Sequence, residues 1–164
     1  MHRTCILGTF RALGPKCPTC SAMYAPLVGT QPDGTMTVST RPRGTVPLSG
    51  HTSVGTIVIN YNFPDGTQDQ HHPNPGQPYR GTSRVAYLPD TSEGREVLQL
   101  LRTSFDRKIT FTVGTSITTG ISNSVIWNGI HHKTATAGGS ACFGYPDRGY
   151  LMRVKQELAA KGIR

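Results

Sequence analysis

The sequence predicts a single α+β domain with a central, mostly antiparallel sheet, two main helices and long ordered loops. Three observations lead to this prediction. Short segments rich in β-branched and apolar residues recur along the chain, two longer segments place apolar residues at helical spacing, and 19 glycines and 12 prolines are dispersed without a tandem period. A length of 164 residues fits one domain with a sizeable core and excludes a second large one.

The composition divides the chain into a short first segment, residues 1–30, and one larger domain, residues 31–164. In the larger domain, β-branched and apolar residues predict strands at 35–40, 54–63, 84–88, 109–113 and 124–128. Residues 64–79 contain four prolines and two glycines, so we expect them to form an ordered loop instead of a helix or an inner strand.

The first helix is predicted at about 91–107. Asp90 and Glu93 have the D-x-x-E spacing of a capping box at its start. The apolar residues of this helix fall on one face: Val97, Leu100, Leu101 and Phe105.

The second helix is predicted at about 148–161, with Asp147 as its N-cap and Gly162 at its end. Glu157 lies within the apolar stripe of this helix. The stripe consists of Tyr150, Leu151, Val154 and Leu158. Because an unpaired buried carboxylate is costly, we expect Glu157 either to bind a backbone amide or an arginine, or to line a wet pocket.

The chain is basic, with a formal net charge of +8 at pH 7, but its Lys and Arg residues form no run of five or more. They fit either a solvated surface or a face that binds phosphates or nucleic acid. No stretch of about 18 apolar residues could span a bilayer, and no long apolar segment near the N-terminus has the form of a signal peptide. From the sequence we expect a cytoplasmic or nuclear location and no membrane partner.

The first segment contains two pairs of residues with zinc-ligand spacing, His2 with Cys5 and Cys17 with Cys20. The two pairs could together close one tetrahedral zinc site. The alternative is that these cysteines are ordinary buried thiols.

The loop at residues 114–120, GTSITTG, offers several backbone N–H groups and the hydroxyls of Thr115, Ser116, Thr118 and Thr119 between Gly114 and Gly120. Such a loop suits a diphosphate or a ribose. It is neither a Walker loop nor a G-x-G-x-x-G motif, and an ordinary turn explains it as well.

His131 and His132 are adjacent, so on an extended segment they point to opposite faces and only one can enter a given pocket. A single His with a distant Glu could polarise a hydroxyl or hold a ribose. Trp127, Phe143 and Tyr145 supply flat apolar surfaces on which an adenine or nicotinamide ring could stack, although core packing explains each of them separately.

Six motifs, in order, resemble the Deltex C-terminal domain: QPDGTM (31–36), HPNPG (72–76), YLPD (87–90), FTVGTSITTG (111–120), WNGIHHKT (127–134) and GYPD (144–147). The first segment resembles the end of a Deltex RING domain, whose cross-brace holds two zinc ions. In that arrangement His2 and Cys5 would complete one zinc site, and Cys17 and Cys20 the other.

The resemblance implies a RING-type E3 ubiquitin-protein ligase, a transferase with roles in Notch signalling, whose partners are ubiquitin and a ubiquitin-conjugating enzyme. Its C-terminal domain would bind ADP-ribose or NAD and recruit ADP-ribosylated proteins for ubiquitination. His131 and Glu157 match the pair to which the family's transfer of ubiquitin to ADP-ribose is attributed. The expected ligand contacts are Gly114, Thr115, Ser116, Thr118, Thr119, Gly120, Trp127, His131, Phe143 and Tyr145. Because half of each zinc site is present, we expect this chain alone to be inactive as a ligase and to need a complete RING to bind zinc.

Three positions depart from the family pattern. Ile117 replaces a serine, Phe143 replaces a His or Tyr, and Gly129 replaces an acidic residue. Loss of the first two polar groups removes hydrogen bonds worth about 0.5–1.5 kcal/mol each, so we expect weaker ligand binding. Two other functions stay open from the sequence: a non-catalytic interaction module that has lost ligand binding and acts through the loop at 64–81, or a basic nucleic-acid binder.

Overall fold

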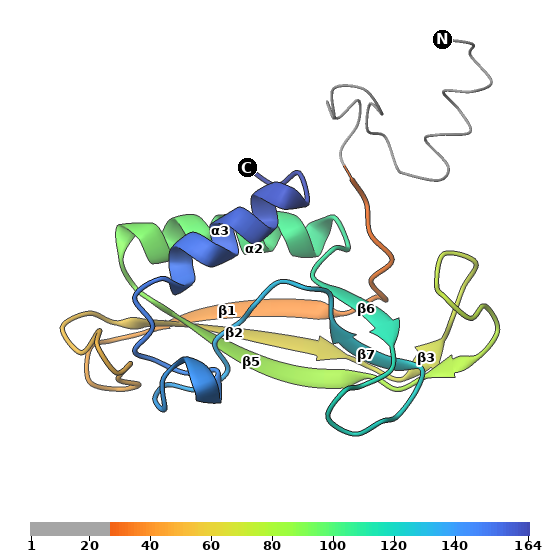
Figure 1. Cartoon of the computed structure of the whole chain (residues 1–164), viewed down its shortest axis with the longest axis horizontal. Helices are drawn as coiled ribbons and strands as arrows, with labels where there is room; N and C mark the ends of the chain where they lie inside the picture. Colours follow the sequence, from red (N-terminus) through yellow and green to blue (C-terminus); the bar gives the residue numbers. More distant parts are fainter. Residues whose placement is uncertain (1–26) are drawn as a thin grey trace, which may run out of the picture.

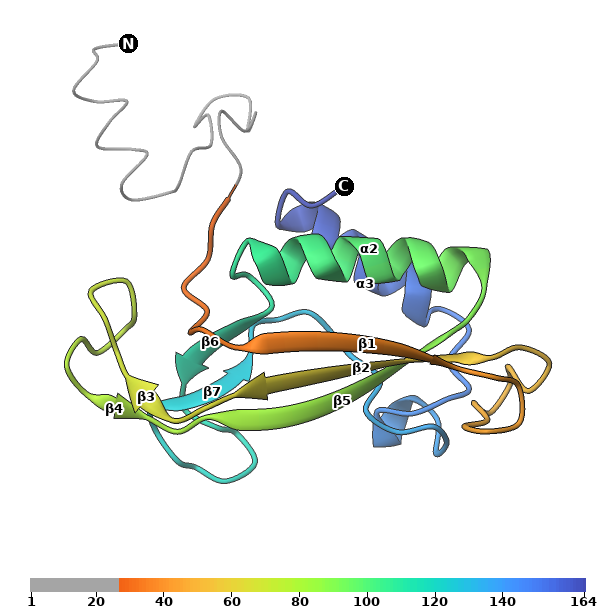
Figure 2. The ribbon, with the colours of Figure 1, turned by 180° about the vertical axis from the view of Figure 1, so that it is seen from behind.

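A three-stranded antiparallel sheet forms one layer of the fold, and two helices lie side by side over one of its faces (Figures 1 and 2). This computed structural model describes residues 27–164. Its elements, in chain order, are β1 (Thr35–Arg41), β2 (Thr56–Phe63), β3 (Gly66–Thr67), β4 (Pro78–Tyr79), β5 (Thr82–Pro89), α2 (Ser92–Asp106), β6 (Phe111–Gly114), β7 (Ser124–Trp127), the 3₁₀ turn η1 (Ser140–Cys142) and α3 (Tyr150–Ala160). The predicted α+β class is confirmed.

The sheet has the strand order β1-β2-β5, with β2 in the centre. Successive strand residues point to opposite faces, and β2 follows this rule closely. Its buried apolar residues under the helices are Ile57, Ile59, Tyr61 and Phe63, whereas Asn60 and Asn62 are exposed on the other face. The five predicted strands are present, each with bounds that differ by at most two residues from the prediction.

Two short strand pairs extend the sheet layer at one end. β6 pairs with β7 next to the end of β2, and the predicted loop at 64–79 contains only the two-residue pair β3–β4 (Figure 1). Chain segments far apart in sequence meet here, because the amide of Val125 donates to the carbonyl of Arg80. This end of the sheet carries the loop at residues 114–121.

Helix α2 begins one residue later than the capping box predicted. Thr91 is the N-cap, and its hydroxyl oxygen accepts from the amide of Gly94 at 3.1 Å. Asp90 instead accepts from the guanidinium of Arg95 at 2.6 Å. Thr and Asp both cap helices well, so the D-x-x-E spacing misplaced the cap by one position.

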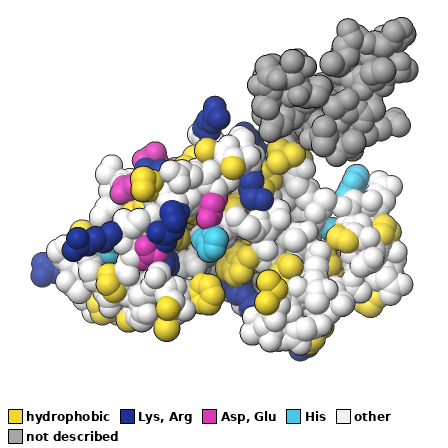
Figure 3. Space-filling model, viewed as in Figure 1, with side chains coloured by type: hydrophobic (Ala, Val, Ile, Leu, Met, Phe, Trp, Pro, Cys, Tyr) yellow, Lys and Arg dark blue, Asp and Glu magenta, His cyan; other side chains and the backbone are white. Residues whose placement is uncertain are grey.

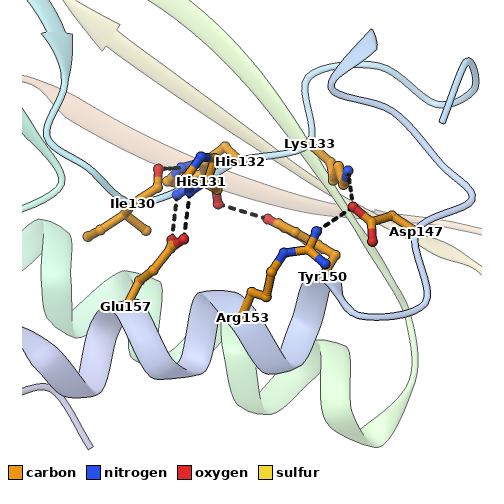
Figure 4. Close-up of polar contacts among 8 residues, drawn as sticks. All are labelled: Ile130, His131, His132, Lys133, Asp147, Tyr150, Arg153 and Glu157. Atoms are coloured by element: carbon orange, nitrogen blue, oxygen red, sulfur yellow. Dashed lines mark hydrogen bonds and ion pairs between the residues drawn. The ribbon is translucent and has the colours of Figure 1, made fainter. Parts of the chain in front are cut away.

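Helix α3 has no side-chain cap, which corrects the prediction for Asp147. The helix begins at Tyr150 after Gly149, and Asp147 lies before this turn with its carboxylate directed at Lys133 and Arg153 (Figure 4). The predicted end is confirmed, because Gly162 follows the last turn with a φ of 75°, a left-handed conformation that favours glycine.

The carboxylate of Asp147 ties α3 to the extended segment at residues 130–134. Its Oδ2 lies 2.7 Å from Nζ of Lys133 and also accepts from Arg153. The side chains of Lys133 and Asp147 are 5% and 8% exposed, and the Lys133 ammonium lies 5.2 Å from the centre of the Tyr150 ring. The hydrogen bonds from Arg153 and Lys133 lower the pKa of Asp147 to about 2.

We expect Asp147→Ala to lower the free energy of unfolding by about 3 kcal/mol, because it leaves the Lys133 ammonium buried without its partner. Urea unfolding at neutral pH measures this loss. The matched control is Asp33→Ala, since Asp33 pairs with Lys108 at an exposed position, where the loss should stay below about 1 kcal/mol.

The difference between wild type and Asp147→Ala should also depend on pH. A depressed carboxyl pKa stabilises the fold above the pKa of the unfolded chain, about 4, and this contribution disappears as the pH falls toward 2. Equal losses for the Asp147 and Asp33 variants, or a difference that does not change from pH 6 to pH 2, would contradict this account.

Candidate functional site

A surface hollow of about 470 Å³ opens between the loop at 114–121, the end of β7 and the segment at 130–134. Figure 3 shows this face, where hydrophobic side chains group around a histidine. The lining residues are Arg84, Ile117, Thr118, Trp127, Gly129, Ile130, His131, His132, Thr134 and Phe143. This volume suits a small-molecule ligand.

The turn after β7 sets the course of the segment at 130–134. The amide and side-chain nitrogens of Asn128 donate to the carbonyls of Thr110 and Ile109, and Gly129 has a φ of 70°, which permits the sharp change of direction. The segment then runs beside β5, where the amide of Tyr87 donates to the carbonyl of Lys133 at 2.8 Å.

His132 points into the core and supports the floor of the hollow. Its Nδ1 lies 2.9 Å from the carbonyl oxygen of Ile130 and its Nε2 lies 3.0 Å from the hydroxyl of Tyr61. A carbonyl only accepts, so Nδ1 carries the proton and Nε2 accepts from Tyr61. Burial lowers the pKa of His132 to about 4, which keeps the ring neutral at pH 7. The ring stacks on Trp127, with centroids 4.1 Å apart.

His131 points the other way, to the surface, as expected of the neighbour of His132, but both rings line the same hollow, which differs from the prediction that only one could enter it. Glu157 of α3 holds it twice, because one carboxylate oxygen lies 2.6 Å from Nδ1 of the ring and the other accepts from the His131 amide at 2.8 Å (Figure 4). The hydroxyl of Tyr150 donates to the carbonyl of His131 at 3.2 Å. Glu157 therefore points inward as predicted, and its carboxylate is hydrogen-bonded by a backbone amide and a histidine ring together.

In the His131–Glu157 pair, the carboxylate engages Nδ1 of the ring and leaves Nε2 free. When Nδ1–H donates to the carboxylate, Nε2 of the neutral ring keeps its lone pair and is free to accept a proton. The side chain of His131 is 72% exposed and that of Glu157 only 25%. Chemically, an imidazole oriented by a carboxylate in this way can serve as a general base.

The loop at 114–121 is closed by its own hydrogen bonds. The hydroxyls of Ser116 and Thr119 accept from amides within the loop, and that of Thr115 donates to Ser122. Of the loop residues, only Ile117 and Thr118 line the hollow, so the structure does not bring Gly114, Thr115, Ser116, Thr119 or Gly120 to its surface. Ile117 is fully exposed.

The three aromatic residues of the predicted stacking surface separate. Trp127 and Phe143 line the hollow, whereas Tyr145 is buried, packs against Tyr150 and donates its hydroxyl to the carbonyl of Tyr87. Phe143 is 62% exposed and has a φ of 53°, which is uncommon for a bulky residue. Tyr145 therefore packs in the core, which was the other role expected for these aromatic residues.

Sequence reasoning missed Arg84 as a lining residue. The available signal was its place in the strand, two positions before the buried Ala86 and so on the same face. The proposed zinc ligands His2, Cys5, Cys17 and Cys20 lie outside the described residues. Within residues 27–164, no group of three or more His, Cys, Asp or Glu side chains could hold a metal ion, and no helix is long and apolar enough to cross a bilayer.

Comparison with known proteins places residues 28–163 in the family model described as the Deltex C-terminal domain. Relatives in Homo sapiens and Mus musculus named "Probable E3 ubiquitin-protein ligase DTX3" are 53% identical over 165 residues, which cover 99% of this chain and 47% of each relative. "E3 ubiquitin-protein ligase DTX4" of Mus musculus is 47% identical over 150 residues, or 90% of this chain and 24% of that relative. The chain spans about half the length of the first of these relatives and less of the other.

The buried neutral His132 predicts acid sensitivity of the fold. Between the unfolded pKa of about 6.5 and the folded pKa of about 4, the unfolded chain binds one proton more than the folded chain at this residue. Stability should therefore fall by about 1.4 kcal/mol per pH unit on this account as the pH is lowered through this range.

Urea unfolding at several pH values measures this slope. It should be smaller in His132→Gln, whatever the variant's stability at pH 7, and unchanged in His71→Gln, because His71 is exposed. A His132 variant with the slope of the wild type would refute the assignment.

Proposed function

This chain belongs to the Deltex C-terminal domain family, and we propose that its hollow binds ADP-ribose or NAD and thereby recruits ADP-ribosylated proteins for ubiquitination. The observation that carries the proposal is the His131–Glu157 pair, which lies at the edge of an open hollow with Trp127 beside it. A flat apolar surface next to a base that can reach a hydroxyl suits a ligand with an aromatic ring and a ribose.

We further propose that, beside a complete RING, this pair promotes transfer of ubiquitin to a hydroxyl of the bound ligand. Nε2 of His131 takes the hydroxyl proton as the oxygen attacks the thioester carbonyl that joins ubiquitin to its conjugating enzyme. The new C–O ester bond forms, the C–S bond breaks, and the imidazolium returns its proton to the thiolate that leaves. Glu157 keeps Nδ1 protonated and stabilises the imidazolium in between.

The rim of the hollow also supports a second candidate, a module that contacts other proteins without binding ADP-ribose. Ile117 and Phe143 are both exposed and both line the hollow, and exposed large apolar side chains on one surface favour protein contacts. A titration with ADP-ribose separates the two candidates, since a well-folded chain that gives no heat and no thermal shift with millimolar ligand would support the second.

Ile117→Ser tests the ligand site by a gain of affinity. It restores the hydroxyl that the family resemblance leads us to expect at this position, so ADP-ribose should bind about 2- to 10-fold more tightly by calorimetry. Ile121→Ser is the matched control, because Ile121 is an exposed isoleucine of the same loop that does not line the hollow. Equal effects of the two substitutions would argue against a ligand site here.

The catalytic proposal is tested in a longer form with a complete RING. His131→Ala should abolish ubiquitin transfer to ADP-ribose, and Glu157→Gln should reduce it strongly, because the first removes the base and the second its carboxylate partner. Ubiquitination of lysine by the same samples should persist. Parallel loss of both activities would indicate a folding or RING defect and would count against the assigned roles.

A further inference from the structure

Arg84 is the one permanently charged side chain that lines the hollow among the described residues. We infer that Arg84 binds the phosphates of the ligand and makes the hollow select nucleoside diphosphates over nucleosides. This inference rests on the proposed function and names the residue that recognises the charged part of the ligand. Four observations support it: strand register, free hydrogen-bond donors, the absence of lining carboxylates and the internal bonding of the nearby loop.

The strand register directs Arg84 toward the hollow. Arg84 of β5 pairs with Tyr61 of β2, and side chains of paired residues lie on the same face of a sheet. Tyr61 packs edge-on against Trp127 and bonds His132, both of which line the hollow. The neighbouring Ser83 faces the other way, where its hydroxyl donates to the side chain of Asn62 at 2.7 Å.

The guanidinium of Arg84 has donors to spare. Its Nη1 donates to the carbonyl of Ser83 at 3.0 Å, and it makes no ion pair among residues 27–164. Arginine carries five N–H donors in a planar fork that matches the oxygens of a phosphate. Most of these donors therefore remain available to a bound anion.

Charge in the hollow favours an anion. No Asp or Glu is among the lining residues, and Glu157 behind His131 already accepts two hydrogen bonds. The apolar side chains of Ile117, Trp127 and Phe143 line the same hollow, and the side chain of Arg84 is itself exposed, so a bound anion can reach it. Charge interactions are stronger beside apolar surfaces than in open solvent.

The loop at 114–121 does not replace Arg84 in this role. Its internal bonds engage the amides of Ser116, Thr119, Gly120 and Ile121, which an open phosphate-binding loop would instead direct at the ligand. Of the loop residues, Ile117 and Thr118 line the hollow, so the loop offers at most two amides to a bound diphosphate, and Arg84 adds the charge that they lack.

Calorimetric titration of Arg84→Gln tests the inference. ADP-ribose binding should weaken about tenfold or more, because a charge-assisted pair with phosphate is lost, whereas binding of adenosine, which has no phosphate, should not change. Arg84→Lys should be intermediate, since it keeps the charge and loses the fork. Arg102→Gln, an exposed arginine of α2 outside the hollow, should behave as wild type. Thermal unfolding checks that each variant is folded.

Inorganic pyrophosphate, used as a second probe, separates failure of this inference from failure of the proposed function. Amide chemical shifts around the hollow should move on addition of pyrophosphate to wild type and should not move in Arg84→Gln. If wild type binds pyrophosphate in this way but does not bind ADP-ribose, the proposed function fails and the role of Arg84 stands. Unchanged ADP-ribose affinity in Arg84→Gln, an equal loss for adenosine, or no response of wild type to pyrophosphate would overturn the inference.

Discussion

The site depends on the hydrogen bonds that hold the segment at residues 130–134 between β5 and α3. This segment belongs to no helix or strand. β5 binds it on one side through the amide of Tyr87, and α3 binds it on the other through Glu157 and the hydroxyl of Tyr150. Its last amide, that of Thr134, donates to the carbonyl of Phe143. An extended segment with partners on both sides has little freedom to rotate, so the directions of its side chains are fixed by the surrounding elements.

This constraint gives two adjacent histidines different chemistry. His132 is buried, neutral and bonded at both ring nitrogens, and it supports Trp127 from below. His131 is exposed and bonded at one nitrogen only, so the other is free. The alternation of side chains along an extended chain thus places one ring in the core and the next at the surface.

The sequence predicted the fold class, the strands, the end of α3 and the inward place of Glu157, because these follow from local periodicity and from glycine at a helix end. It misplaced both helix caps, since several residues near each helix start can cap and tertiary partners decide among them, as Lys133 and Arg153 do for Asp147. It also grouped Tyr145 with Trp127 and overlooked Arg84. The burial of Tyr145 follows from the path of the chain after β7, which local patterns do not encode. For Arg84, the alternation with Ala86 indicates the face of the strand, but only the pairing with Tyr61 of β2 brings it to the hollow.

In the closed loop at 114–121, different residues set the shape of the loop and its contribution to the surface of the hollow. Its shape comes from hydrogen bonds among its own backbone and hydroxyl groups, and the side chain of Ile117 takes no part in them. We therefore expect substitutions of Ile117 to cost little in folding stability, although they alter the lining of the hollow. A substitution at such a position changes the surface of the hollow and leaves the scaffold of the loop as it is.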